Sequence, residues 1–312
     1  MMIHNTPASV AQLLANYQQC TSDITYSTGK LEFTGVGDKD IYNITAPFTS
    51  AGQVVIAGRV EARDSEHSTI VFFSEHQSKW RPIADAPTFQ LQDPFFTRIE
   101  DELIFGGVEI NPHPDNPDKL IWHTVFYRGR DIHSLTRFAS GPTGMKDIRL
   151  CHIQQGRIGV FTRPQGNIGG RGTIGYVEIN NLEALTPETI ASAELFDQQF
   201  NTDEWGGVNE THLLRDGTIG LLSHIACFDQ HGGRHYYPGV FIFNPDTKIY
   251  TSIKIIATRN NLLPGSAKRP DLVDVIFPGG LIKLPDNRWR LYVGASDAEA
   301  HWIDIKDPFI GL

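Results

Sequence analysis

The chain has 312 residues and a formal charge of −9, from 27 Lys and Arg against 36 Asp and Glu. About 40% of the residues are hydrophobic and 20% are charged, which is typical of a globular protein and excludes a disordered chain. The acidic balance disfavours nucleic acid or a membrane surface as a partner, because both attract basic proteins. The length fits one large all-β domain as well as two smaller ones.

The three cysteines, Cys20, Cys151 and Cys227, are far apart and form no Cys-x-x-Cys pair. This excludes a disulfide framework and a cysteine zinc site, and free thiols are typical of a reducing compartment. No stretch is apolar for long enough to span a bilayer, and the first residues do not resemble a secretory signal. The sequence therefore predicts a cytoplasmic protein.

An amphipathic helix is predicted at residues 7–18, within an N-terminal extension of residues 1–20. Its apolar residues recur at the spacing of one helical face: Val10, Leu13, Leu14 and Tyr17. We expect Thr6 to cap this helix, and Pro7 suits its first turn.

Beyond residue 20 the pattern changes to short runs of β-branched and aromatic residues, separated by glycine, proline and polar turns. These runs are predicted to be buried strands: 54–58, 69–73, 103–105, 121–127, 158–161, 174–177, 219–222, 239–243 and 289–293. A turn or two of helix is predicted near residues 183–193. This spacing of strands predicts an all-β sandwich, barrel or propeller.

A repeat decides among these folds. Five segments, about 50–65 residues apart, share one plan in which an acidic or amide residue opens a short strand and further strands follow polar turns. Five four-stranded blades fit 312 residues. The sequence therefore predicts an all-β, five-bladed β-propeller with a short N-terminal helix, as a single domain over residues 1–312.

Residues at equivalent places in the blades of a propeller converge on its axis. We therefore expect a central ring of carboxylates and amides: Asn43, Asp93, Asp147, Glu210 and Asp274. A second ring is expected from Glu61, Glu109, Arg163, His224 and Asp297. Carboxylates held close together shift one another's pKa, which suits the acid and base of glycoside cleavage. The alternative is that these side chains cap backbone amides of the inner strands.

Three further features bear on such a site. Residues 166–172 are rich in glycine, but they precede a strand and lack the Gly-Lys-Ser/Thr ending of a nucleotide loop, which predicts a rim loop. Trp205 and Tyr236 are candidates for packing on sugar rings, and Arg59 belongs to a charged cluster after a buried strand.

Four stretches carry a resemblance to a known family: residues 92–95, 161–164, 221–224 with 237–245, and 275–281 with 292–297. They occur in the same order as four motifs of glycoside hydrolase family 130 and resemble them. The first three are the family's Asp-Pro, Arg-Pro and Tyr-His-Gly motifs. The fourth is its final blade, which contains Phe-Pro-x-Gly followed by Ala-Ala-Asp. That family contains the β-mannoside phosphorylases and hydrolases, which are five-bladed propellers. The resemblance spans residues 40–300 and is that of a divergent sister family.

The resemblance implies that Asp93 is the catalytic acid and that Arg163 and His224 lie where the phosphorylases bind phosphate. Phe95 replaces the arginine that follows Asp-Pro in the family, and both neighbours of His224 are replaced as well. Glu210 stands where the family has a Pro-Pro pair. Since attack by water needs a carboxylate base, the departures favour hydrolysis, with Glu210 as the base.

We therefore expect a glycoside hydrolase of short oligosaccharides, with β-mannosides as candidate substrates, Asp93 as acid and Glu210 as base. Asp274 is the second choice for the base, and neither a metal nor an organic cofactor is expected. Other positions are expected to bind substrate or tune the acid: Asn43, Arg59, Glu61, Asp147, Arg163, His224, Asp274 and Asp297. Two alternatives stay open, an inverting phosphorylase that uses inorganic phosphate and a non-catalytic sugar-binding propeller.

Overall fold

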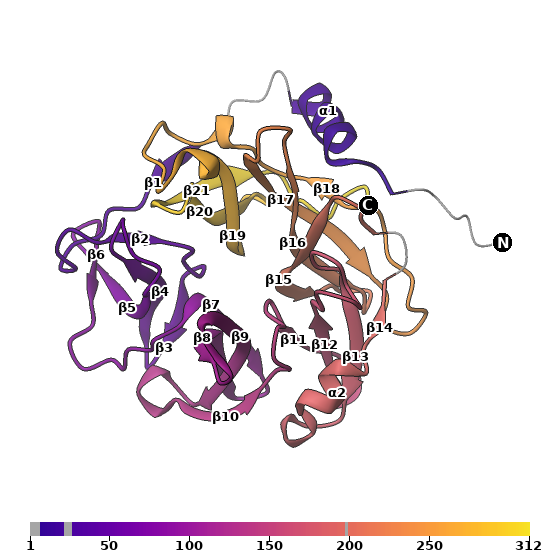
Figure 1. Cartoon of the computed structure of the whole chain (residues 1–312), viewed down its shortest axis with the longest axis horizontal. Coiled ribbons are helices and arrows are strands. Elements are labelled where there is room, and N and C mark those ends of the chain that lie inside the picture. Colours follow the sequence, from indigo (N-terminus) through magenta and orange to yellow (C-terminus); the bar gives the residue numbers. More distant parts are fainter. Residues whose placement is uncertain (1–6, 22–26, 197–198) are drawn as a thin grey trace.

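Strands dominate the computed structural model, which describes residues 7–21, 27–196 and 199–312. The sheets stand in a ring around a common centre (Figure 1), and apolar side chains fill the layers between neighbouring sheets. This confirms the all-β prediction. Neither α-helix within the described ranges is long and apolar enough to cross a membrane.

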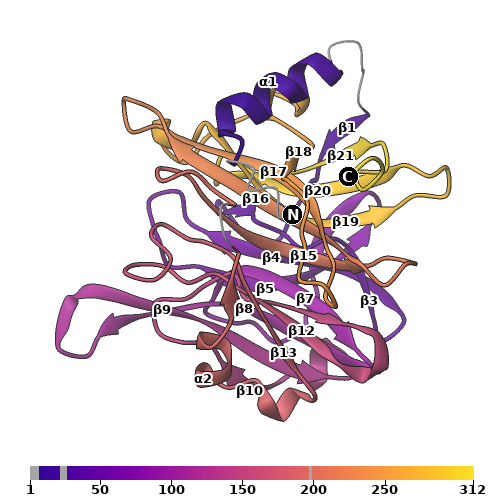
Figure 2. The same cartoon turned by 90° about the vertical axis from the view of Figure 1, so that its right-hand side faces the viewer.

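Three sheets follow one another along the chain, each with antiparallel neighbours. The first contains β2 (Asp40–Tyr42), β3 (Phe48–Ser50), β4 (Gln53–Glu61), β5 (Thr69–His76) and β6 (Lys79–Pro82). The second contains β7 (Gln92–Ile99), β8 (Glu102–His113), β9 (Asn116–Gly129) and β10 (Thr136–Ser140). The third contains β11 (Arg149–His152), β12 (Ile158–Thr162), β13 (Gly175–Ile179) and β14 (Glu194–Leu195). The β8–β9 hairpin extends well beyond the other strands of its sheet (Figure 2).

A larger sheet of eight strands completes the ring. Its first half contains β15 (Trp205–Leu213), β16 (Ile219–Phe228), β17 (Arg234–Phe243) and β18 (Lys254–Ile255). Its second half contains β19 (Asp274–Lys283), β20 (Trp289–Ala295), β21 (Glu299–Ile305) and the N-terminal β1 (Thr28–Lys30). The halves are joined by a short parallel pairing of β17 with β19, in which His235 lies opposite Asp274. The five-blade count stays a prediction.

The inner strands carry local irregularities that aim side chains at the centre. The pairing register shifts between Gln92 and Phe95 in β7, between Val208 and Glu210 in β15, and between Pro278 and Gly280 in β19. A bulge of this kind re-aims the residue that it leaves unpaired. Asp93 lies within the first of these bulges and Asn209 within the second.

The predicted N-terminal helix is present as α1 (Val10–Thr21) and lies across the outside of the β16–β18 region (Figures 1 and 2). It begins three residues later than predicted, because the Ser9 hydroxyl accepts a hydrogen bond from the Gln12 N–H at 3.2 Å and so serves as the cap. Thr6, the expected cap, lies outside the described residues. Val10, Leu13 and Tyr17 are buried against the sheet, as their spacing predicts.

Short helical segments complete the fold. The predicted turns near residues 183–193 are present as η3 (Leu182–Ala184) and α2 (Pro187–Ala191). The other 3₁₀ turns are η1 (Ile132–Ser134), η2 (Gln154–Gly156), η4 (Arg259–Asn261) and η5 (Pro270–Leu272). All of them lie in connections between strands.

Candidate active site

Three of the predicted central residues share an unusual backbone conformation. Asn43, Asp93 and Asp147 have φ angles of 43°, 50° and 58°, in the left-handed region where Asn and Asp are the most tolerated non-glycine residues. All three are buried. The Asn43 side-chain amide donates to Asp93 Oδ1 at 2.8 Å, so the structure brings these two predicted residues into contact.

Asp93 belongs to a buried charged group that we call the Asp93 cluster: Asn43, Arg59, Glu61, Asp93, Lys268 and Asp297. Arg59 lies 3.2 Å from Asp93 and 2.8 Å from Glu61, and Lys268 pairs with Glu61 from the other side. Burial opposes ionisation of Glu61, yet Arg59 and Lys268 lower the pKa of Glu61 to about 2. Glu61 is therefore a permanent anion that holds two cations beside Asp93.

Asp297 behaves differently from its neighbours. Burial raises the pKa of Asp297 to about 6, the charge of Arg59 opposes this rise, and the charge of Asp93 adds to it. Both Asp297 and Ser296 have positive φ angles, of 50° and 56°, in the turn between β20 and β21. Within the described ranges, no hydrogen bond or ion pair holds the Asp297 carboxyl, so it remains available to a ligand.

A second buried group lies beside the third sheet, and we call it the arginine pocket: Asp147, Arg149, Arg163, Asn209 and His224. Arg163 Nη1 lies 3.3 Å from Asp147 Oδ2, and Arg149 Nη2 lies 3.9 Å from Asp147 Oδ1. Burial raises the pKa of Asp147, but the nearby cations, Arg163 first among them, lower it to about 2. Within the described part of the chain, Arg163 Nη1 and Asp147 Oδ1 form these ion pairs but no hydrogen bond.

Glycines make room for Arg163. A Cβ atom at Gly207 would lie 2.5 Å from Arg163 Cδ, and one at Gly172 would lie 2.6 Å from Arg163 Nε. Arg163 Nε donates to the Gly206 carbonyl at 2.7 Å, and Nη2 donates to the Arg171 carbonyl at 3.2 Å. The glycine-rich segment 166–172 therefore borders the arginine pocket, as a rim loop would.

Two other predicted carboxylates, Glu210 and Asp274, are held by hydrogen bonds to other groups. Glu210 accepts hydrogen bonds from the Leu281 backbone N–H at 2.6 Å and from His212 Nε2 at 2.8 Å. Asp274 bonds His235 Nδ1 at 2.7 Å and also the Tyr237 hydroxyl, at the β17–β19 junction. Among the residues that the structure describes, no hydrogen bond or ion pair joins either carboxylate to Asp93.

Glu109 also lies apart from the centre. It forms ion pairs with Arg137 at 2.8 Å and with His123 at 3.1 Å, on the β8–β9 hairpin and its neighbour β10. The Glu109–Arg137 pair is partly exposed, so we treat it as part of the hairpin surface rather than of the site.

Sequence reasoning missed several central residues. Arg149 is 4% exposed, and its guanidinium lies 4.1 Å from the centroid of the Phe95 ring; its place two residues after Asp147 was a usable signal. Lys268 comes from the long connection between β18 and β19, where nothing in the sequence marks it. Asn209 was hidden by its neighbour Glu210, because the bulge in β15 could not be predicted.

An aromatic path runs from the arginine pocket to the surface. The Tyr236 ring stacks on His224 with centroids 5.7 Å apart, and Trp205 Nε1 donates to the Tyr236 hydroxyl at 3.0 Å. Trp205 is only 4% exposed, so it supports the path rather than offering a free face. Phe228 is 38% exposed at the outer end, where Arg171 lies 4.8 Å from the centroid of its ring.

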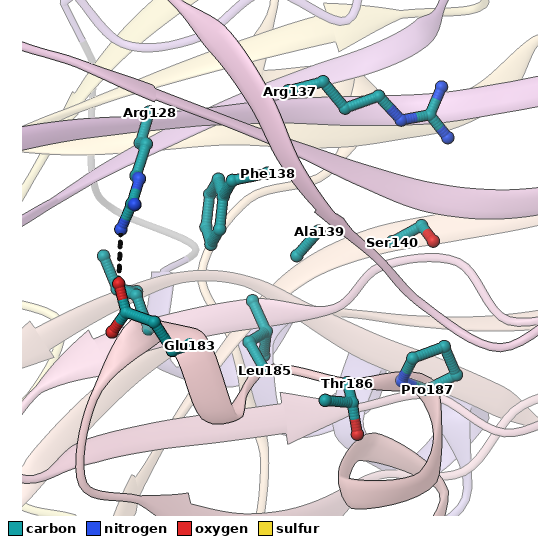
Figure 3. Close-up of a pocket in the computed structure, with 10 residues that line it drawn as sticks. Arg128, Arg137, Phe138, Ala139, Ser140, Glu183, Leu185, Thr186 and Pro187 are labelled. Atoms are coloured by element: carbon teal, nitrogen blue, oxygen red, sulfur yellow. Dashed lines mark hydrogen bonds and ion pairs between the residues drawn. The ribbon is translucent and has the colours of Figure 1, made fainter.

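A separate groove lies at the outer edge of the ring, between β10 and the η3–α2 segment (Figure 3). Its volume is about 450 Å³. Arg128 pairs with Glu183 at 2.9 Å at one end. The groove contains none of the predicted catalytic or substrate-binding residues.

A ring of sheets around buried carboxylates and buried arginines defines an all-β protein with a charged centre. The chain matches the model of the family described as "Protein of unknown function (DUF1861)" over residues 17–311, and it belongs to that family. A search of curated protein sequences found no match.

Solved structures give further likenesses. The mannose phosphorylase MPT-4 from Leishmania mexicana, in complex with phosphate ion, is 33% identical with a TM-score of 0.87, over 96% of this chain and 93% of that chain. MPT-1, a GDP-Man-dependent mannosyltransferase from the same organism, is 32% identical with a TM-score of 0.87, over 97% of this chain and 96% of that chain. A β-1,2-mannobiose phosphorylase from Listeria innocua, at 12% identity and a TM-score of 0.61 over 90% and 91%, shares the fold.

Proposed function

We propose that the chain is a five-bladed β-propeller whose eight-stranded sheet counts as two blades. The support is its division into two four-stranded halves, β15–β18 and β19–β21 with β1, that are joined only by the short parallel pairing at His235. Each half repeats the antiparallel order of the other three sheets. On this count every blade supplies at least one residue to the Asp93 cluster or the arginine pocket.

We propose that the protein is an inverting phosphorylase that cleaves short β-mannosides with inorganic phosphate. The observation that carries this proposal is that two buried arginines, Arg149 and Arg163, share the single buried carboxylate Asp147. This group has one more cation than anion, and an uncompensated buried positive charge is costly unless an anionic ligand balances it. The phosphate complex of the 33% identical mannose phosphorylase agrees with this assignment.

In the proposed reaction, Asp93 supplies the proton that the leaving sugar oxygen takes up, directly or through a sugar hydroxyl. A phosphate oxygen held by Arg163 forms the bond to the anomeric carbon as the glycosidic bond breaks. The products are α-mannose 1-phosphate and a shortened sugar, so one proton and one mannosyl group are transferred. Asn43 and Arg59 fix the Asp93 carboxylate, and Asp297 is available to a sugar hydroxyl.

Hydrolysis, which the sequence favoured, needs a base for water. Glu210 was the first choice, but Glu210 Oε2 already accepts two hydrogen bonds, from Leu281 N and His212. Asp274, the second choice, is engaged by His235 and Tyr237. Phosphate needs no base of this kind, so the engaged carboxylates support phosphorolysis over hydrolysis.

A second candidate is transfer of mannose from a nucleoside diphosphate. Arg171 and Phe228 favour it, because the aromatic path leads outward from the arginine pocket and ends in an exposed ring beside a guanidinium. Planar bases stack on such surfaces. The 32% identical MPT-1 is a GDP-Man-dependent mannosyltransferase.

The test is an assay of β-mannobiose and longer β-mannosides with phosphate, without phosphate, and with GDP-mannose as donor. Wild type is compared with Asp93→Asn and with the matched control Asp101→Asn, an exposed carboxylate in the turn of the same sheet. We expect mannose 1-phosphate only when phosphate is present, and loss of activity only in Asp93→Asn. Free mannose without phosphate would establish hydrolysis instead. GDP release would favour transfer, and binding without any product would favour a non-catalytic protein.

A further inference from the structure

Asn209 connects three parts of the centre from the β15 bulge, where it is 4% exposed. Its side-chain Nδ2 donates to the Pro278 carbonyl at 3.0 Å, and its Oδ1 lies 2.8 Å from His224 Nδ1. Its backbone carbonyl accepts a hydrogen bond from Arg149 Nε at 2.8 Å. Because the Pro278 carbonyl can only accept, the Asn209 amide has a single consistent orientation, with Oδ1 facing His224.

The tautomer of His224 follows from this orientation. Since Asn209 Oδ1 can only accept, His224 Nδ1 must carry a proton. Burial lowers the pKa of His224 to about 3 despite the opposing charge of Asp147, so the ring is neutral and Nε2 keeps its lone pair. Among the described residues, none forms a hydrogen bond with Nε2.

The groups around His224 agree with a neutral ring. The charged and titratable groups that face it are Asp147, Arg163, Lys146, Arg149 and the stacked Tyr236. Three of the five are cations, and they disfavour a further positive charge on the imidazole. Among the described residues, the pocket thus combines one acceptor that has no hydrogen bond, His224 Nε2, with two buried arginines that pair with Asp147.

We infer that Asn209 positions His224 as a hydrogen-bond acceptor, so that the arginine pocket selects an oxyanion that carries a proton over one that carries none. Phosphate and arsenate keep a proton at neutral pH, and it can be donated to Nε2 while other oxygens accept from Arg163. Sulfate has no proton, so its oxygen would face the lone pair of Nε2. The binding of an anion in this pocket rests on the proposed function, whereas the tautomer of His224 does not depend on it.

The first test is ¹⁵N NMR of the histidines in the full-length wild-type protein. The His224 signals are assigned by their loss in His224→Gln, and we expect the neutral Nδ1–H form throughout about pH 5 to 8. His301 is the internal control, because its Nε2 lies 3.0 Å from Glu299 and its buried Nδ1 has no partner, so it should show the opposite tautomer. A protonated Nε2 on His224, or titration within this range, would overturn the inference.

The second test is calorimetric binding of phosphate, arsenate and sulfate at pH 7. We expect phosphate and arsenate to bind wild type about tenfold or more tightly than sulfate, since an unmade buried hydrogen bond costs at least this factor. In Asn209→Asp, the carboxylate beside Nδ1 should favour the doubly protonated ring, so the preference for phosphate over sulfate should fall about tenfold.

These readouts separate the two proposals. Selective phosphate binding without phosphorolysis would leave the inference standing and remove the proposed reaction. Phosphorolysis together with equal binding of sulfate and phosphate would overturn the inference and leave the proposed reaction standing. The tautomer is decided by wild-type spectra assigned with His224→Gln, and the selectivity is decided by wild type alone, so the inference stays testable if Asn209→Asp fails to fold.

Discussion

The chemistry at the centre depends on which way single residues point. Asn43, Asp93 and Asp147 were predicted from the repeat, and all three adopt the same left-handed backbone. Glu210 was predicted by the same reasoning, but the bulge in β15 directs Asn209 to His224 and Glu210 to the Leu281 backbone. A shift of one residue in a strand reverses the face of every side chain. The sequence identifies the position in the repeat, whereas the bulge decides which neighbour faces the centre.

Asp93 is the residue with the largest expected effect on activity. Replacing it by Asn keeps the shape and the contact with Asn43 but removes the transferable proton. We expect kcat to fall about 10²-fold or more, and thermal stability to fall as well, because the buried Arg59 loses one of its anionic partners. Steady-state assays and thermal unfolding of wild type and Asp93→Asn measure this. A variant that retains most of its activity would show that another group is the acid.

Asp297 should make stability depend on pH. Its pKa is about 6 in the folded protein, against 3.8 for an ordinary aspartate. Ionisation therefore lowers the free energy of unfolding as pH rises from about 4 to 6, and the full cost applies above pH 6. Asp297→Asn should therefore stabilise the protein at pH 8, by an amount on the order of 2 kcal/mol. The gain should vanish near pH 4. Urea unfolding at pH 8 and pH 4 measures the gain in stability, with Asp101→Asn as the control. Equal gains at the two pH values would contradict a raised pKa of Asp297.

At the level of elements, periodicity predicted most of the structure. The nine predicted strands and the N-terminal helix are all present, because apolar spacing reports which face is buried. Boundaries were less accurate: Ser9, not an earlier residue, caps α1. The long connection that delivers Lys268 to Glu61 could not be predicted, because it has no periodic pattern and its partner is distant in sequence.

Helix α1 is expected to stabilise the fold through the few apolar side chains that it buries. Leu13 is 8% exposed and packs with the core residues beneath α1, which contacts β16 and β18, so Leu13→Ala should lower the free energy of unfolding by about 2 kcal/mol. Gln12→Ala, one residue earlier and exposed, should change it by less than about 0.5 kcal/mol. Chemical denaturation compares them. Similar effects of the two substitutions would mean that α1 is not docked in solution.

At the scale of the whole molecule, the N-terminal β1 completes the last sheet. It pairs with β21, with Gly29 opposite Trp302. A Cβ atom at Gly29 would lie 2.6 Å from the Trp302 indole, so Gly29→Val should displace β1 and open the ring.

We expect Gly29→Val to lower the melting temperature by several degrees, as a loss of about 1–3 kcal/mol does in a domain of this size. Activity at 25 °C should persist, because the Asp93 cluster lies on other strands. Ala15→Val, on the exposed face of α1, is the matched control for adding the same side chain. An unchanged melting temperature in Gly29→Val would show that β1 adds little to closure.

The pairing of β1 with β21 also constrains the order of events during synthesis. The Thr28 hydroxyl bonds the Trp302 carbonyl, a partner 274 residues later in the chain. A ribosome must therefore deliver the chain as far as β21 before β1 can pair. Contacts of such long sequence separation form slowly, and unpaired strands promote aggregation in the meantime. The pairing of β1 with β21 is thus a late step of folding, and chaperone dependence should concentrate there.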